Sequence, residues 1–277
     1  MTLQTRPLSE TNYAMRVILA FILAWWPIHV FAQTTEVDVE LVLAVDVSRS
    51  MEPWELEIQR RGYAEALRSD AVWAAIQRGL LQRIAVTYVE WAGFGTQRII
   101  VPWTLIETRE DAEQVADKVT AHFDEGLRRT SITSALDYSA YLIKQNEYDG
   151  LRRVIDISGD GPNNSGGTVS TARDAIVAQG ITINGLPLMT HNPNGPYARW
   201  GIPDLDVYYQ SCVIGGPGAF VIPVDDWDNF ADAVRRKLVL EIAQDPLPIW
   251  RVQSQNSYNC RIGEEIWQRN MDLMTLP

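Results

Sequence analysis

The chain has 277 residues, of which 46% are hydrophobic and 21% are charged, with 24 Lys and Arg against 35 Asp and Glu. This length and hydrophobic content supply the core of one large domain or two small ones, and they exclude a disordered chain. The formal net charge of −11 argues against nucleic acid or another polyanion as a partner.

An apolar stretch near the amino terminus predicts a cleaved export signal over residues 1–32. A basic residue precedes the apolar residues 17–32, which end in small side chains of the kind that a signal peptidase reads. The alternative is an uncleaved membrane anchor, for which the stretch is short. We expect cleavage after Ala32, a periplasmic or secreted protein and no stable membrane span afterwards. The translation start is Met1 or Met15.

Apolar runs then alternate with helical patterns, and this order predicts an α/β fold with a doubly wound, mostly parallel sheet and helices on both faces. The expected strands are residues 37–45, 84–91, 98–103, 152–158, 181–186 and 219–224. The segment Gly93-Phe94-Gly95-Thr96 between the second and third strands is long enough for a hairpin but too short for a crossover helix. We therefore expect one antiparallel edge strand.

Five helical segments are expected between these strands. They are residues 53–68 with a second piece after residue 70, 108–123, 131–143, 169–179 and a segment starting at 226. In the second piece, Val72, Ile76 and Leu80 follow at four-residue steps, as on one face of a helix. Thr108 suits the N-cap of the segment with the most regular apolar spacing.

Two segments do not follow this alternation. Residues 189–200 are rich in Asn, Pro and Gly, and the tail 244–277 shows little periodicity. We therefore expect a domain over residues 37–243 followed by a C-terminal tail. In an oxidising compartment Cys212 and Cys260 would pair across a loop of about 49 residues, which contributes about 3–4 kcal/mol. Two buried free thiols are the alternative.

Oxygen-bearing side chains follow the first expected strand. The segment Asp46-Val47-Ser48-Arg49-Ser50 comes directly after the apolar residues 41–45. Alternate side chains of an extended segment point the same way, so Asp46, Ser48 and Ser50 converge past the end of the strand. A carboxylate and two hydroxyls are hard ligands that suit Mg²⁺, Mn²⁺ or Ca²⁺ rather than zinc.

Two later residues complete the pattern. Thr130 precedes the helix expected at 131–143, and Asp160 follows the strand expected at 152–158. In open parallel sheets, ligands bind beyond the carboxyl ends of the strands, where the connections diverge. We expect the strands that end near Asp46 and Asp160 to be neighbours, so both carboxylates should reach the same crevice.

In this order, the Asp-x-Ser-x-Ser motif, the threonine ahead of an Ala-Leu helix and the Asp-Gly after a later strand resemble the metal-ion-dependent adhesion site of von Willebrand factor type A domains. The resemblance spans roughly residues 37–240. Together with the export signal, the stretches 159–164 and 212–220 are similar to an uncharacterised branch of exported bacterial type A proteins, a domain of unknown function. The resemblance implies the Rossmann-like type A fold.

The resemblance also implies a divalent cation, Mg²⁺ before Mn²⁺ or Ca²⁺, and a set of ligands. Direct ligands would be Ser48, Ser50 and Thr130, with Asp46 and Asp160 binding through water or in exchange with Thr130. Such a shell leaves an open position that an acidic side chain of a protein partner fills. As an alternative, the hydroxyl residues are only turn and helix-capping residues, as such residues often are.

Residues around this motif are candidates for partner contact. Type A domains often have glycines beside the threonine, whereas this chain has Arg128 and Arg129, which would either repel the ion or attract an acidic partner. Tyr197 and Trp200 in the polar insert are expected to contact a partner. Asp156, inside a strand of Val and Ile, needs a buried structural partner.

Enzymatic functions have little support in the sequence. The histidines that remain after signal removal, His122 and His191, lie in an expected helix and in the insert, without a Gly-x-Ser-x-Gly elbow. The chain also has no phosphate-binding Gly-x-x-x-x-Gly-Lys-Ser/Thr motif. The expected function is metal-dependent protein–protein interaction. The alternatives are a metal-dependent hydrolase in the same crevice and a domain that binds partners without an ion.

Overall fold

A computed structural model describes residues 34–121, 127–190, 195, 198–243 and 258–275. The expected signal segment, His122, His191 and Tyr197 lie outside these residues. None of the described helices is both long and apolar enough to cross a membrane.

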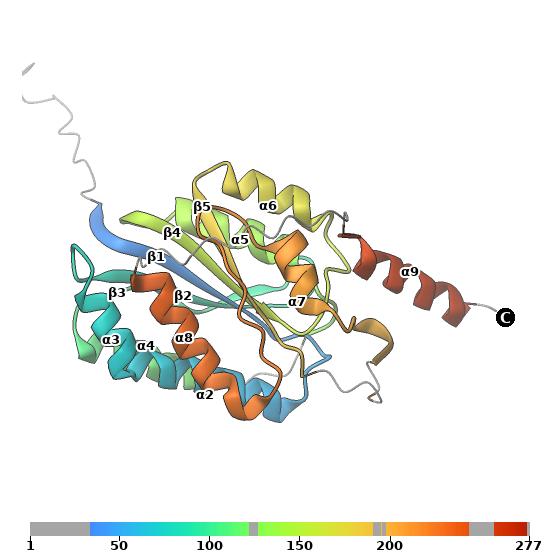
Figure 1. Ribbon diagram of the computed structural model, residues 1–277, viewed down its shortest axis with the longest axis horizontal. Helices are drawn as coiled ribbons and strands as arrows, with labels where there is room; N and C mark the ends of the chain where they lie inside the picture. The colour runs from blue at the N-terminus through green and yellow to red at the C-terminus, as the bar shows by residue number, and fades with distance from the viewer. Residues whose placement is uncertain (1–33, 122–126, 191–194, 196–197, 244–257, 276–277) are drawn as a thin grey trace, which may run out of the picture. The chain divides into compact units, whose positions relative to one another are not determined.

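Five strands form one sheet in the order β3-β2-β1-β4-β5 (Figure 1). The strands are β1 (Thr35–Asp46), β2 (Ile84–Trp91), β3 (Gln97–Ile106), β4 (Tyr148–Gly159) and β5 (Ile181–Pro187). All neighbouring pairs are parallel except β2 and β3, which are antiparallel. The expected mostly parallel sheet with one antiparallel edge strand is confirmed. The chain extends the sheet first to one side of β1 and then to the other, so the connections diverge beyond the carboxyl ends of β1 and β4.

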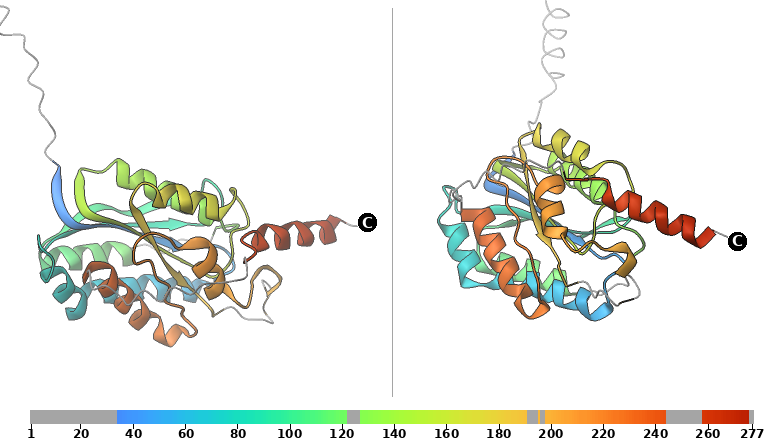
Figure 2. Two further views of the ribbon diagram at one scale, coloured as in Figure 1. Left: turned by 45° about the horizontal axis from the view of Figure 1, so that its top comes forward. Right: turned by 45° about the vertical axis from the view of Figure 1, so that its right-hand side comes forward.

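Helices cover both faces of the sheet (Figure 2). They are α2 (Pro53–Arg68), α3 (Asp70–Gln77), α4 (Arg109–Thr120), α5 (Ile132–Lys144), α6 (Val169–Val177), α7 (Leu205–Tyr208), α8 (Phe230–Ala243) and α9 (Ile262–Thr275), with the short helices η1 (Ala198–Trp200), η2 (Tyr209–Val213) and η3 (Trp227–Asn229). One core packs α2, α3, α4 and α8 against Leu41 and Leu43 of β1. The other packs α5, α6 and α7 against Val42 and Ala44, because successive side chains of a strand point to opposite faces.

Local signals in the sequence explain where the helices begin. Thr108 and Asp111 form a reciprocal capping box at the start of α4. Ser131 caps α5 by accepting a hydrogen bond from the amide of Ser134 over 3.3 Å. Helix α3 ends at Gln77, so Leu80 lies beyond it and is 82% exposed, which removes it from the apolar face that the spacing indicated.

One expectation about the carboxyl-terminal third of the chain is wrong. Residues 219–224 form isolated bridges to β5 and its end, through Val221 and Val224, instead of a sixth strand. Pro223 in that segment has no amide hydrogen for a ladder. The tail, which shows little apolar periodicity, contains the fourteen-residue helix α9.

The expected structural partner of Asp156 is Lys237 of α8. Its Nζ lies 2.6 Å from Asp156 Oδ1 and 2.5 Å from Glu241 Oε1, and all three side chains are buried. Asn184 of β5 donates a further hydrogen bond to Glu241 over 3.0 Å. One buried ammonium thus faces two carboxylates, and burial raises the pKa of Glu241 to about 7. Burial also raises the pKa of Asp156, against the opposing effect of Lys237.

Candidate metal centre

Hydrogen bonds join the loop after β1 to the loop after β4. The amide of Ser48 donates to Asp46 Oδ1 over 2.7 Å, and the hydroxyls of Ser48 and Ser50 are 2.9 Å apart. The Ser50 hydroxyl in turn donates to Asp160 Oδ1 over 2.8 Å. The two ends of the predicted motif are therefore in direct contact at the carboxyl ends of β1 and β4.

Main-chain contacts hold the loop before α5 against both of these loops. Ser48 and Leu127 form a parallel bridge, in which the amide of Arg49 donates to the Leu127 carbonyl over 2.7 Å. The Thr130 carbonyl accepts from the amide of Asn164 over 2.9 Å, and its amide donates to Asn164 Oδ1 over 3.1 Å. Thr130 lines the same pocket as Ser48 and is 6% exposed.

Asp46 has an environment that is unfavourable for an isolated carboxylate. It is fully buried, and its Oδ2 has no hydrogen-bond partner in the described part of the chain. Burial raises the pKa of Asp46 well above its usual range, and the charge of Asp160 raises it further, while the hydrogen bond from the Ser48 amide lowers it. A cation would offset both the burial and the repulsion.

The oxygen atoms of this cluster fit a hard divalent cation. Two carboxylates and three hydroxyls belong to Asp46, Ser48, Ser50, Thr130 and Asp160, and such ligands suit Mg²⁺ more than a thiol- or imidazole-binding metal. The described residues contain no group of three or more His, Cys, Asp or Glu side chains placed to hold a metal. Any ion at this site would therefore depend on the hydroxyls.

Gly159 and Tyr209 lie next to the Asp46 side chain. A Cβ atom on Gly159 would lie 2.9 Å from Asp46 Oδ2 and 2.9 Å from the hydroxyl of Tyr209. The Tyr209 hydroxyl is buried and has no hydrogen-bond partner among the described residues. The absence of a side chain at position 159 thus leaves room for the Asp46 carboxylate.

Asn163 and Asn164 connect the loop after β4 to the neighbouring loop and helices by hydrogen bonds. Asn163 is fully buried, and its Oδ1 accepts from the amide of Thr133 over 3.1 Å. Its Nδ2 donates to Glu264 Oε1 over 2.6 Å, which connects the loop after β4 to α9.

A pocket of about 310 Å³ opens beside the cluster. It is lined by Ser48, Arg49, Ser50, Arg128, Arg129, Thr130, Asn164, Trp200 and Trp267. Three of the predicted partner-binding residues, Arg128, Arg129 and Trp200, thus lie beside the predicted metal ligands. Trp267 of α9 was not singled out from the sequence, because the tail shows little apolar periodicity. Arg129 adopts a φ of 71° and lies over the Trp267 ring, with its guanidinium carbon 4.7 Å from the ring centroid.

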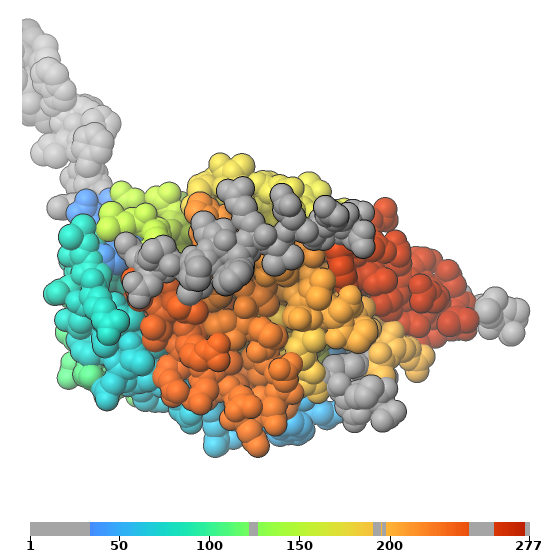
Figure 3. Space-filling model, viewed as in Figure 1, coloured from blue at the N-terminus to red at the C-terminus, as the bar shows by residue number. Residues whose placement is uncertain are grey.

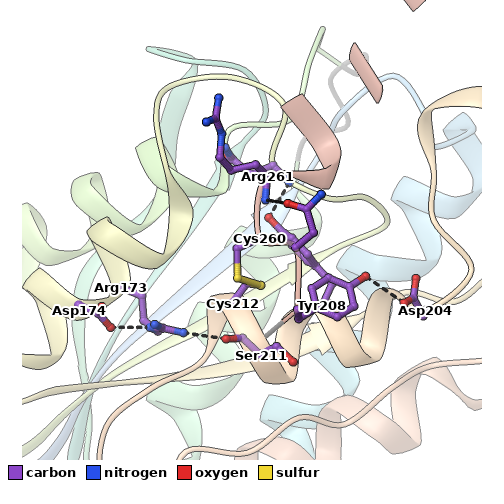
Figure 4. Close-up of a disulfide and its surroundings, with 11 residues drawn as sticks. Arg173, Asp174, Asp204, Tyr208, Ser211, Cys212, Cys260 and Arg261 are labelled. Carbon is purple, nitrogen blue, oxygen red and sulfur yellow. Dashed lines mark hydrogen bonds and ion pairs between the residues drawn. A yellow bond between two sulfur atoms is a disulfide. The ribbon is translucent and has the colours of Figure 1, made fainter. Parts of the chain in front are cut away.

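A disulfide joins Cys212 of η2 to Cys260 in the tail, as predicted (Figure 4). Two residues before the tail cysteine, the hydroxyl of Tyr258 donates to Asp204 Oδ2 over 3.0 Å. Arg173 of α6 also donates to the Ser211 carbonyl over 3.0 Å. The disulfide and the Tyr258 contact connect the chain just before α9 to the segment around α7 and η2, and in Figure 3 the atoms of α9 (red) continue the surface of that segment (orange).

Comparisons with known proteins show the fold. Residues 36–246 match a family described as a protein of unknown function, DUF1194. No curated protein matches the sequence. The solved structure of proximal thread matrix protein 1 from the mussel byssus aligns with a TM-score of 0.51 and 14% identity, covering 76% of this chain and 49% of that one.

Two bacterial structures are also similar. The pilus adhesin SpaC from Lactobacillus rhamnosus GG aligns with a TM-score of 0.53 and 12% identity, over 74% of this chain and 31% of the adhesin. A von Willebrand factor type A protein from Catenulispora acidiphila aligns with a TM-score of 0.48 and 13% identity, over 75% and 43% of the two chains. The chain thus spans about half or less of the length of each of these proteins. The α/β fold is von Willebrand factor type A-like.

Proposed function

Because the chain belongs to the DUF1194 family of proteins of unknown function, through residues 36–246, its activity has to be argued from its own site, and we propose that this site binds a divalent cation and uses it to hold an acidic side chain of a partner protein. Mg²⁺ is the preferred ion and Mn²⁺ the closest substitute. The proposed ligands are Asp46, Ser48, Ser50, Thr130 and Asp160. The role is binding, without catalysis.

The observation that carries this proposal is the contact between the two ends of the motif. Ser50 reaches Asp160 through a 2.8 Å hydrogen bond, while Ser48 touches both Ser50 and, through its amide, Asp46. Turn and capping roles explain such contacts within one loop. They do not explain why hydroxyls and carboxylates from separate loops gather beside a buried carboxylate oxygen that has no described hydrogen-bond partner.

The residues of the chain have separate parts in this function. The Ser48 amide donates a hydrogen bond to Asp46, and two hydrogen bonds of the Thr130 main chain to Asn164 support a position for the threonine at the pocket that both serines line. A divalent cation bound here would supply positive charge that keeps both carboxylates ionised and an open position for one further carboxylate. The hydroxyl ligands add no charge, so they leave the ion able to attract an acidic group.

We place the protein in the periplasm or outside the cell. The export signal predicted over residues 1–32 supports this location, and so does the Cys212–Cys260 disulfide, because disulfides persist in oxidising compartments. A partner would then be another exported or surface protein.

Thermal unfolding with and without millimolar Mg²⁺ or Mn²⁺ tests the cation site. The melting temperature of the wild type should rise with either ion, because a ligand that binds only the folded state stabilises it. Asp46→Ala should lose this gain. Asp149→Ala is the matched control, since Asp149 is an exposed aspartate near the start of β4. If neither ion raised the melting temperature of the wild type, the proposal would be overturned.

A further inference from the structure

The tail helix α9 is built into the rim of the candidate metal centre. Gly263 packs so closely that a Cβ atom there would lie 2.0 Å from the carbonyl oxygen of Asn163. Glu264 accepts a hydrogen bond from the Asn163 side chain, and Asn270 Nδ2 donates to the Arg199 carbonyl of η1 over 3.0 Å. With the disulfide at Cys260, these contacts fix the helix at several points along its length.

This docking gives the pocket two tryptophans. Trp267 comes from α9 and Trp200 from η1, and both are partly buried. The ring of Trp267 also holds Arg129 through a cation–π contact. Aromatic side chains of this kind exclude water from a binding pocket, which strengthens the charge interactions inside it.

The charge of the pocket is opposite to that of the chain. Three of the nine lining residues are arginines, Arg49, Arg128 and Arg129, and none is acidic. All three arginines are exposed. None of them takes part in the ion pairs between described residues. In a chain with a formal net charge of −11, such a positive concavity focuses attraction for anions.

The arginines also need more negative charge than the site itself provides. Asp46 and Asp160 together balance a single divalent cation, so the three guanidinium groups leave the loaded pocket positive. One carboxylate from a partner would occupy the open position at the cation. The three guanidinium groups would still face no anion, although arginine is the side chain best suited to bind a carboxylate through two hydrogen bonds.

We propose that the pocket receives a short acidic segment of a partner protein that carries two carboxylates on the same side. One carboxylate binds at the cation, and the other binds among Arg49, Arg128 and Arg129, with Trp200 and Trp267 beside the segment. A volume of about 310 Å³ is at the small end of the range of ligand pockets, roughly 300–1,000 Å³, so it accommodates a few side chains. This inference rests on the proposed function of the cation site.

Binding of two synthetic peptides tests it. The first is the acetylated and amidated Gly-Asp-Gly-Asp-Gly, whose two carboxylates lie on one side when the peptide is extended. The second has asparagine in place of the second aspartate. In Mg²⁺, calorimetry should give an affinity for the first peptide at least about ten-fold higher, which corresponds to about 1.4 kcal/mol.

Variants of the pocket then locate the second carboxylate. The double variant Arg128→Gln with Arg129→Gln should bring the two affinities close together, whereas Arg235→Gln, at an arginine of α8 that pairs with Asp232, should leave their ratio unchanged. Trp267→Ala should weaken both peptides, while Leu273→Ala, at an exposed position of the same helix, should not. The Mg²⁺-dependent gain in melting temperature of the double variant should equal or exceed that of the wild type, because two positive charges leave the surroundings of the ion.

The outcomes separate the two proposals. Equal affinities for the two peptides in a wild type that Mg²⁺ stabilises would overturn the two-carboxylate pocket and leave the cation site standing. A wild type without any Mg²⁺-dependent stabilisation would overturn the cation site itself. A ratio that the double arginine variant does not change would also overturn the pocket.

Discussion

The hydroxyl of Ser50 donates a hydrogen bond to Oδ1 of Asp160 over 2.8 Å, although 110 positions separate the two residues in the chain. The contact exists because β1 and β4 are parallel neighbours, so that the loops at their carboxyl ends meet. Ser50 and Asp160 can each be mutated without changing the other residue.

Ser50→Ala and Asp160→Asn should each lower the affinity for Mg²⁺ by about ten-fold or more. The first change removes a proposed ligand, and the second removes a charge while keeping an acceptor for the serine; losing even an outer partner of a metal site typically costs roughly 10–100-fold. Calorimetric titration with Mg²⁺ measures the effect. Ser139→Ala is the control, because the Ser139 hydroxyl is buried within α5 and donates to the Ala135 carbonyl. Unchanged affinity in both site variants would exclude these residues as ligands.

Glu241 should make the stability of the protein fall as pH rises. Its pKa is raised from 4.5 to about 7 in the folded protein, so the folded state binds more protons than the unfolded state between about pH 4.5 and 7. The free energy of unfolding therefore decreases across this interval. Glu241→Gln should flatten the dependence and raise stability at pH 8, as measured by urea unfolding from pH 5 to 8. If the free energy of unfolding of Glu241→Gln changed with pH as steeply as that of the wild type, Glu241 would not be the source of this pH dependence.

Lys237→Met should lower the free energy of unfolding at pH 7, which is opposite to the effect of Glu241→Gln and larger. It keeps a side chain of similar length but leaves Asp156 and Glu241 buried without their shared ammonium group. Breaking a buried ion pair in this way costs about 3–5 kcal/mol. Urea unfolding at pH 7 measures the loss, which should shrink when Glu241→Gln is added. A loss below about 1 kcal/mol would show that the buried charges are compensated by other means.

Gly263→Ala should disturb the docking of α9. The new methyl group would meet the main chain of Asn163, which cannot move aside as a flexible side chain can. Overpacking of this kind costs about 1–3 kcal/mol, which lowers the melting temperature by roughly 2–4 °C per kcal/mol. Gly161→Ala is the matched control in the loop that α9 contacts, because its Cβ would meet nothing within 4 Å. Equal melting temperatures of the two variants would contradict the tight contact.

Reduction of the Cys212–Cys260 disulfide should destabilise the protein and loosen α9. The two cysteines are 48 positions apart, and closing such a loop contributes about 3–4 kcal/mol in the chain-entropy model. Thermal unfolding with and without reductant measures the difference. Without reductant the mass of the exported protein should not change on alkylation, whereas two alkyl adducts would dismiss the bridge.

The sheet could be predicted because its signals are local and apolar. The parallel strands are buried mainly towards their carboxyl ends, where apolar residues predominate, and a short connection is enough to identify the antiparallel pair. The meeting of Asp46 with Asp160 followed from strand adjacency alone. Ligation of a cation by the five site residues stays a prediction until an ion is measured.

Helix α9 could not be predicted in the same way, because few of its contacts are apolar; Ile262 alone of its residues packs against the second core in the described part of the chain. It docks through Gly263, through the Glu264 and Asn270 side chains and through Trp267 over an arginine. Positions 263, 267 and 270 have the spacing of one helical face, but glycine, tryptophan and asparagine do not form an apolar stripe. The sequence contained one indication of this helix, because acidic residues favour the first turn of a helix and Glu264 and Glu265 lie there. Trp267, and with it one side of the pocket, was therefore missed.

Both margins of the sheet resist the addition of a further strand. Along β5, residues 219–224 already occupy hydrogen-bonding positions through Val221 and Val224. Along β3, Pro102 lacks an amide hydrogen and lies where the register with β2 shifts. Self-association into ribbons, the usual hazard of an open sheet, is thus discouraged on either side. Under the proposed function, a partner would be bound by side chains at the arginine pocket and not by strand addition at a sheet edge.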